Sequence, residues 1–438
     1  MKKQMNKNGS IMVFLTSILI TMIMVSMVFV HAARSVCGAS YSDAVFELAG
    51  RSVLAEFDRR LKDEYGLFAY YGFEDRVESS FWFYASGSFK KKYPGESGVR
   101  IGMMTDLFRL KLQHVNAKLA AYSLMDVDVF EDQIDGYMNY LFAEKGLQFI
   151  MEMGSKGSKE AADSKGEERE LKNQAEINSL PSSGNVSNGI DISAITAAIM
   201  SSDEFINKFT RNFKVNEYIM SHFKYSVGGG KEKETMFRNE VEYILYGKMK
   251  DKDNQSRFRT DFFIIRSALN VFHIVNSQEK SEAVKALAAL FSPAPWVWVA
   301  IIGAWGAAEA ENDARRLLAG EKVPLFKDDS EWALGLDMAI NVMCIYDDEG
   351  EITNVEATSK SINGYISPRS DAGLSYADYL RLFLFFEKRE TKLLRTMDLI
   401  QLNLRGTYYK DFLIKNHYTG FSLTAVVSGR TFEYAQKY

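Results

Sequence analysis

The chain contains little cysteine: only Cys37 and Cys344 occur among 438 residues. An exported domain of this size that is held together by disulfides would carry more cysteines, so a disulfide-rich scaffold is excluded. We expect two unpaired thiols, with a single Cys37–Cys344 bridge as the alternative. Cys37 also lacks the aliphatic and small residues that precede a lipoprotein cysteine, because Arg34, Ser35 and Val36 come before it.

An excess of positive charge is also missing. Lysine and arginine number 53 against 57 acidic residues, which gives a net charge of −4. A protein that binds nucleic acid needs a basic face, so we expect no nucleic-acid partner. Hydrophobic residues make up 47% of the chain and aromatic residues 13%. This composition can bury sizeable cores, and it excludes disorder of the whole chain.

The short motifs of catalysis and metal binding are absent as well. The five histidines are scattered and form no H-E-x-x-H pair, and no G-x-S-x-G elbow occurs. The glycines at 228–230 and the lysine after them lack the spacing of a phosphate loop. Acidic groups at 126–132 and 251–253 lack the glycine-bearing loop that binds calcium. We therefore expect no enzyme activity, catalytic residue, cofactor, metal site or small-molecule substrate.

The chain does have one long uncharged apolar run, residues 11–30. About twenty helical residues span roughly 30 Å, the thickness of the hydrocarbon core of a bilayer. We expect a transmembrane helix over residues 11–33. Its apolar side chains would contact the lipid bilayer: Ile11, Val13, Phe14, Leu15, Ile18, Leu19, Ile20, Ile23, Val25, Val28, Phe29 and Val30. A secretory signal cleaved after Ala33 is the alternative, although such apolar cores usually run only ~7–15 residues.

Flanking charge predicts the orientation of this helix. Lys2, Lys3 and Lys7 lie in residues 1–10, which contain no acid, whereas Asp43 and Glu47 follow the apolar run. Basic flanks stay in the cytoplasm. We therefore expect residues 1–10 to be a cytoplasmic basic leader. The protein would be a single-pass cell-membrane protein with the bulk of its chain extracytoplasmic.

An α+β fold is expected beyond the membrane, with helices and a small sheet. Apolar residues at three- and four-residue steps continue from Tyr41, which predicts a long stalk helix with a kink near Gly38. Period-two residues up to Val127 and Val129 favour strands, and residues 130–153 return to helical spacing. We therefore assign residues 34–153 to the stalk helix and an α+β domain.

The rest of the chain is expected to form a second domain after a linker. Residues 154–189 hold few large apolar groups, which predicts a flexible linker. Residues 190–438 predict a mainly helical domain with strands toward its end, including strands at 339–346 and 352–357 and one helix over 375–404. The apolar run 295–308 is short for a membrane span, so we expect a buried helix, with a second span as the alternative.

Five stretches carry a family resemblance: GSIMVFLTSILI, SVLAEFDRRLKDEYGLFAYYG, EVEYILYGKMKDKDN, SYADYLRLFLFF and AWGAAEAENDARRLLAGEKVPLFK. They resemble an uncharacterised bacterial family of membrane-anchored TadE/TadG-like proteins from tight-adherence (Flp-type) pilus loci. The resemblance covers nearly the whole chain apart from the linker, and its last stretch is the most distinctive. That family-like block is marked by Trp305, Glu309, Asp313, Leu317, Gly320 and Pro324. The resemblance implies protein partners in a pilus or secretion assembly.

One departure from pilins refines this expectation. Type IV pilins carry a glutamate five residues after their processed glycine, where it neutralises the amino terminus of a neighbouring subunit. Gly9–Ser10 is a candidate processing site in this chain, but the corresponding position is Phe14. The resemblance therefore implies a minor pilin-like or assembly component, without catalytic activity. Two alternatives stay open: a membrane-tethered extracytoplasmic enzyme acting on cell-wall material, and a two-span membrane scaffold or sensor.

Overall fold

A computed structural model describes two compact units of the chain. The described residues are 7–89, 108, 110–145, 169–184, 191–193, 195, 202–227, 235–291, 294–337, 366, 368 and 372–438. The anchor unit comprises residues 1–62, 68–126 and 415–438, and the helical unit comprises residues 63–67 and 127–414.

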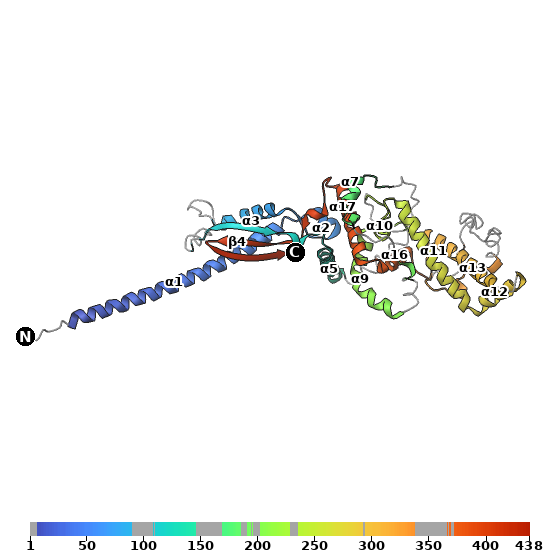
Figure 1. Ribbon diagram of the computed structural model, residues 1–438, viewed down its shortest axis with the longest axis horizontal. Coiled ribbons are helices and arrows are strands. Elements are labelled where there is room, and N and C mark those ends of the chain that lie inside the picture. Colours follow the sequence, from blue (N-terminus) through green and yellow to red (C-terminus); the bar gives the residue numbers. More distant parts are fainter. Residues whose placement is uncertain are drawn as a thin grey trace, which may run out of the picture. The chain divides into compact units, whose positions relative to one another are not determined.

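Helix α1 (Lys7–Leu54) is the longest element of the anchor unit, and Figure 1 shows it as one uninterrupted rod. Its 48 residues correspond to about 72 Å of helix. The expected stalk is therefore confirmed as a continuous helix, but without an interruption at Gly38. The main chain turns out of the helix after Leu54, so the stalk ends earlier than its apolar spacing suggested.

Three antiparallel strands form the main sheet of the anchor unit, in the order β2-β4-β5. Their bounds are β2 (Leu112–Lys118), β4 (Gly420–Val427) and β5 (Arg430–Lys437). In the register, Ala425 of β4 lies opposite Val115 of β2 and Phe432 of β5. Buried and partly exposed residues alternate along β4, which gives this strand one face toward the core.

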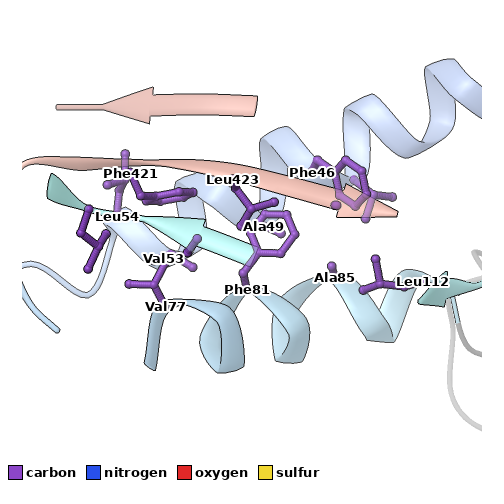
Figure 2. Close-up of a cluster of buried hydrophobic side chains, with 14 of the residues drawn as sticks. Phe46, Ala49, Val53, Leu54, Val77, Phe81, Ala85, Leu112, Phe421 and Leu423 are labelled. Carbon is purple, nitrogen blue, oxygen red and sulfur yellow. The ribbon is translucent and has the colours of Figure 1, made fainter. Parts of the chain in front are cut away.

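The core of the anchor unit lies between this sheet, α1 and α3 (Glu74–Phe89) (Figure 2). Phe46 of α1 and Phe81 of α3 place their ring centroids 5.5 Å apart, and both side chains are buried. Phe421 and Leu423 of β4 belong to the same cluster. The second half of α1 is therefore the spine on which the sheet and α3 pack.

The anchor unit is assembled from segments that are far apart in the sequence. Strand β2 precedes residues 127–414 of the helical unit and β4 follows them, so this large segment is inserted between two paired strands. A second, two-stranded sheet pairs β1 (Tyr70–Tyr71) with β3 (His417–Tyr418). The expected assignment of residues 190–438 to one domain differs from this division, because composition does not show which distant strand β4 pairs with.

Helices make up most of the described part of the helical unit. They are α5 (Val127–Lys145), α7 (Gln174–Asn178), α9 (Ser202–His222), α10 (Glu240–Tyr246), α11 (Asp251–Asn276), α12 (Gln278–Phe291), α13 (Pro295–Leu318), α16 (Tyr376–Phe386) and α17 (Arg389–Thr407). Helix α2 (Arg59–Tyr65) crosses the boundary between the units. The described residues also contain short 3-10 helices: η1 (Ala120–Tyr122), η2 (Pro181–Gly184), η3 (Asp329–Glu331) and η4 (Ile414–Asn416).

Helix α17 is the central element of the helical unit. Every residue from Thr391 to Leu404 is buried, including the charged side chains of Lys392, Arg395 and Asp398. A helix that is covered on all sides lacks the one-sided apolar stripe of a surface helix. Its polar residues must therefore find their hydrogen-bond partners inside the unit.

Several local expectations differ from the structure. Val127 and Val129, expected in a strand, begin helix α5. The single helix expected over 375–404 is two helices, because Glu387 and Lys388 adopt extended main-chain angles between α16 and α17. The strands expected at 339–346 and 352–357 lie outside the described residues.

The expected flexible linker differs from the structure over residues 169–184. Leu171 and Leu180 are buried there, and Glu170 forms an isolated bridge with Lys250. The main-chain N–H of Ser182 also donates a hydrogen bond to Asp398. Two buried leucines and these main-chain bonds tie this otherwise polar stretch to the helical unit. The remainder of the expected linker lies outside the described residues.

The apolar run 295–308 forms the first part of α13. Val297, Ile301 and Trp305 are buried against Ile274 of α11 and Val284 of α12. The expectation of a buried helix is confirmed on this face. Within the described chain, α1 is the one helix whose length and composition would let it cross a membrane.

Candidate functional site: an apolar anchor and a buried charge cluster

The first half of α1 exposes its apolar side chains. The predicted anchor residues are all 41–71% exposed: Ile11, Val13, Phe14, Leu15, Ile18, Leu19, Ile20, Ile23, Val25, Val28, Phe29 and Val30. Burying such a side chain is worth roughly 1.5–3 kcal/mol relative to leaving it in water. A long unbroken apolar surface of this kind fits a lipid environment, and its length fits a single-pass anchor.

Two threonine side chains within this segment bond to their own helix. Thr16 Oγ1 donates to the carbonyl of Val13 at 2.9 Å, and Thr21 Oγ1 donates to the carbonyl of Ile18 at 2.8 Å. Hydroxyls that bond locally can enter hydrocarbon without leaving an unpaired donor.

The residues expected to set topology and processing lie at the start of this helix or before it. Lys7, Gly9 and Ser10 lie in the first turns of α1. Lys2 and Lys3 are outside the described residues, as is Cys344, whereas Cys37 is exposed on α1. Orientation, processing and cysteine pairing therefore stay predictions.

A buried charge cluster lies in the helical unit, where α13 packs on α11. We define it by five charged side chains that are at most 3% exposed: Arg266, Glu309, Asp313, Arg316 and Lys327. Buried ions are costly unless each finds a partner of opposite charge and further hydrogen bonds.

Arg266 of α11 is the centre of this cluster. Its Nη2 and Nε atoms lie 2.9 and 3.1 Å from Oδ2 of Asp313. It also donates to the main-chain carbonyls of Pro324 at 2.9 Å and Leu325 at 2.6 Å, and to Asn270 at 3.1 Å. Burial lowers the pKa of Arg266, but Asp313, Tyr379 and Glu309 together outweigh burial and raise that pKa above its usual value. Arg266 is therefore a fully charged group that holds a loop against two helices.

Lys327 neutralises the remaining buried carboxylate. Its Nζ atom lies 2.7 Å from Oδ1 of Asp313 and also contacts Glu309. Glu309 accepts hydrogen bonds from the main-chain N–H groups of Ala333 and Leu334, at 3.0 and 2.9 Å. Glu309 and Asp313 are thus balanced by Arg266 and Lys327. The pairs attach the loop after α13 to the helix itself.

The six family-like residues lie on α13 and in the chain that follows it, and Glu309 and Asp313 belong to the charge cluster. Four of them recur every fourth residue and share one face of α13: Trp305, Glu309, Asp313 and Leu317. Trp305 Nε1 donates to the carbonyl of Leu334 at 2.9 Å. Gly320 has a φ of +87° just after the helix, a conformation that glycine adopts at low cost. The Pro324 carbonyl accepts from Arg266, as described above.

The sequence analysis did not identify Arg266 and Lys327, the cations that pair with Asp313 and Glu309. Arg266 is a single cation within an apolar helical stretch that includes Phe262, Ile265 and Leu269, all buried. A charge on the buried face of a helix predicts a partner of opposite sign, and this signal could have identified Arg266. Lys327 follows the helix in a polar loop and carries no such signal.

A second polar network contains titratable groups with strongly shifted pKa values. Burial raises the pKa of Glu240 to about 7, although it accepts hydrogen bonds from Lys224 and Asn403. Burial also raises the pKa of Asp398 to about 6 and lowers the pKa of Lys392 to about 8. These groups titrate near neutral pH, and they lie in the core of the helical unit.

The geometry of these groups favours a structural role. Asp398 accepts from the Ser182 main chain and the Tyr243 hydroxyl, each at 3.0 Å, and Lys392 Nζ donates to Asn216 at 2.7 Å. Across the described ranges, no set of three or more His, Cys, Asp or Glu side chains is arranged to hold a metal ion. These buried polar groups hold segments of the helical unit together.

Comparison with known proteins identifies a family. Residues 142–429 match the model of a family of unknown function, DUF5702. The match covers more than half of the chain, so the chain belongs to this family. It includes the buried charge cluster and β4 but not α1. No curated protein and no solved structure matches the chain. The expected link to pilus proteins therefore stays a prediction.

Proposed function

We propose that this member of the DUF5702 family is a single-pass membrane protein with its bulk outside the cytoplasm. In this proposal it is a non-catalytic, minor pilin-like or assembly component of a tight-adherence-type pilus or secretion system. The membrane part of the proposal is supported by the structure of α1. The pilus part is supported by the sequence resemblance alone.

The observation that carries the proposal is the change of exposure along α1. Phe29 is 71% exposed, whereas Phe46, on the same unbroken helix, is 1% exposed. One half of the helix is thus suited to lipid and the other half is the core of a folded unit. A rigid connection of this kind transmits position and force between the membrane and the folded body, which is what an assembly component needs.

The polar core of the helical unit supports a binding or scaffolding body more than an enzyme. Glu240 has a raised pKa, as a catalytic acid often has. However, Glu240 is only 1% exposed. Its carboxylate oxygens accept hydrogen bonds from the Lys224 main-chain N–H at 2.9 Å and from the Asn403 side chain at 2.6 Å. A carboxylate used in this way fixes neighbouring segments.

Affinity purification from native membranes tests this function. The tagged full-length protein, crosslinked in cells before extraction, should recover subunits of a pilus or secretion apparatus. The matched control replaces residues 11–30 with an unrelated transmembrane helix, so that the external body is unchanged. If the external body makes the contacts, this control should recover the same partners. If residues 11–30 make them, the control should lose those partners. Recovery of no such subunit with the native chain would contradict the pilus assignment.

A further inference from the structure

A cavity of about 400 Å³ lies in the anchor unit where α1 meets the end of the sheet. This volume falls within the ~300–1,000 Å³ of small-ligand sites. Its polar wall contains His31 and Arg34 of α1 and Arg430 at the start of β5. Phe108, Val427 and Phe432 contribute an apolar wall.

The position of this cavity along α1 is set by the end of the apolar run. Val30 is the last residue of that run, and Arg34 follows it by four residues, or about 6 Å of helix. The headgroup layer of a bilayer is about 5–8 Å thick on each side of its ~30 Å hydrocarbon core. The polar wall of the cavity therefore lies at headgroup level when residues 11–30 span the membrane.

The charge of the cavity is positive. Among the described residues that line it there is no carboxylate, and no described acid forms an ion pair with Arg34 or Arg430. Arg430 donates to the carbonyl of Ser35 at 3.2 Å and also contacts the Ser35 hydroxyl. This contact fixes one guanidinium beside the helix that carries the other. Arginine is the preferred partner of phosphate oxygens because its donors form a planar fork.

We propose that this cavity binds the phosphodiester of an anionic phospholipid headgroup, through Arg34 and Arg430. The apolar wall would face the glycerol and the start of the acyl chains. The proposal rests on the membrane anchor proposed above, because the headgroup layer meets the cavity only if residues 11–30 span the bilayer.

Native mass spectrometry of the full-length protein tests the site. Detergent-solubilised protein is titrated with phosphatidylglycerol, with phosphatidylcholine, or with inorganic phosphate. We expect one retained phosphatidylglycerol per chain, at concentrations where phosphatidylcholine is not retained. A juxtamembrane arginine strengthens binding about five-fold, so R34Q and R430Q should each weaken retention about five-fold. R430K keeps the charge but loses the planar fork, so its retention should lie between that of the native chain and that of R430Q.

Arg51 provides the matched control, because it lies on the same helix about 30 Å beyond the apolar run. R51Q should bind phosphatidylglycerol as the native chain does. Equal retention of the two lipids, or unchanged retention in the R34Q/R430Q double variant, would overturn the site. Retention of inorganic phosphate at the same concentration and with the same arginine dependence would overturn the lipid assignment.

Flotation of the same proteins with phosphatidylglycerol vesicles separates this proposal from the anchor. All arginine variants should float, because residues 11–30 are unchanged. If the native chain does not float, the anchor and the headgroup site are both overturned. If all variants float but the double variant retains lipid normally, the headgroup site alone is wrong.

Discussion

At the residue scale, burial decides what each charge contributes. Arg266 and Arg259 lie two turns apart on α11, and each pairs with a carboxylate of α13. The Arg266 side chain is 1% exposed and the Arg259 side chain is 42% exposed. Water screens the second pair and cannot reach the first.

Replacing these two arginines by alanine should therefore have unequal effects. R266A leaves Asp313 without its main partner in the core and should cost about 3–5 kcal/mol of unfolding free energy. R259A removes a half-exposed pair and should cost less than about 1 kcal/mol. At roughly 1 °C per kcal/mol for a chain of this size, the thermal midpoint of the full-length protein in detergent distinguishes them. Equal midpoints for the two variants would show that the cluster does not stabilise the fold.

Glu240 makes stability depend on pH. Its pKa rises from the ordinary 4.5 to about 7 in the folded chain, so the folded state keeps a proton that the unfolded state releases. This contribution is fully present below about pH 4.5 and is lost as the pH rises through about 7. E240Q cannot titrate, so its thermal midpoint should fall less between pH 5 and pH 7 than that of the native chain. The corresponding difference in the change of unfolding free energy should be at most roughly 3 kcal/mol.

The exposed Glu390, at the start of α17, supplies the control for this measurement. E390Q makes the same chemical change in water and should keep the pH dependence of the native chain. If E240Q keeps it as well, then Glu240 is not protonated in the folded state at pH 5–7.

At the element scale, close helix packing explains how the charge cluster is enclosed. A Cβ atom on Gly306 of α13 would lie 2.9 Å from Cγ2 of Val271 on α11 and 3.3 Å from its main-chain nitrogen. A Cβ atom on Gly303, less than one turn earlier, would meet nothing within 4 Å. The absence of a side chain at Gly306 therefore lets α11 and α13 approach each other.

Two glycine substitutions test this packing. G306L should lower stability by roughly 1–3 kcal/mol, because a leucine side chain has no space between α11 and α13. G303L should be neutral or raise stability by up to about 1 kcal/mol, since leucine favours helix more than glycine does. Thermal midpoints of the two variants provide the comparison. A neutral G306L would mean that the helices are not in close contact at this position.

Elements with strong local signals could be predicted from the sequence, and elements defined by distant partners could not. The apolar run and the three- and four-residue spacing after Tyr41 identified α1. Alternating residues after Phe412, ending in SLTAVVS, predicted closing strands, and β4 lies in this stretch. The break between α16 and α17 lacks proline and glycine, and apolar spacing continues across it, so the sequence gives no stop signal at Glu387. The many polar residues of α17 are typical of an exposed helix, so the sequence does not show that this helix is buried.

At the scale of the whole molecule, the connection between units is the least predictable feature. Strand β2 finds its partner β4 about three hundred residues later, as the pairing of Asn116 with Thr424 shows. Any sequence-based boundary placed between them separates strands of one sheet. The family match, residues 142–429, extends from the helical unit past residue 414 into the last segment of the anchor unit. The candidate sites follow the same rule: the anchor could be predicted locally, whereas Arg266 and Lys327 became evident only as partners of α13.

Cysteine accessibility on intact cells tests the central claim most directly. Replacing Cys37 and Cys344 by serine gives a cysteine-free background, into which S330C or K3C is introduced alone; Ser330 is exposed in the helical unit. A membrane-impermeant maleimide should label S330C on intact cells and K3C only after permeabilisation, because the proposed topology puts them on opposite sides of the bilayer. Labelling of K3C but not S330C on intact cells, or release of the labelled protein into the medium without residues 11–30, would contradict the account.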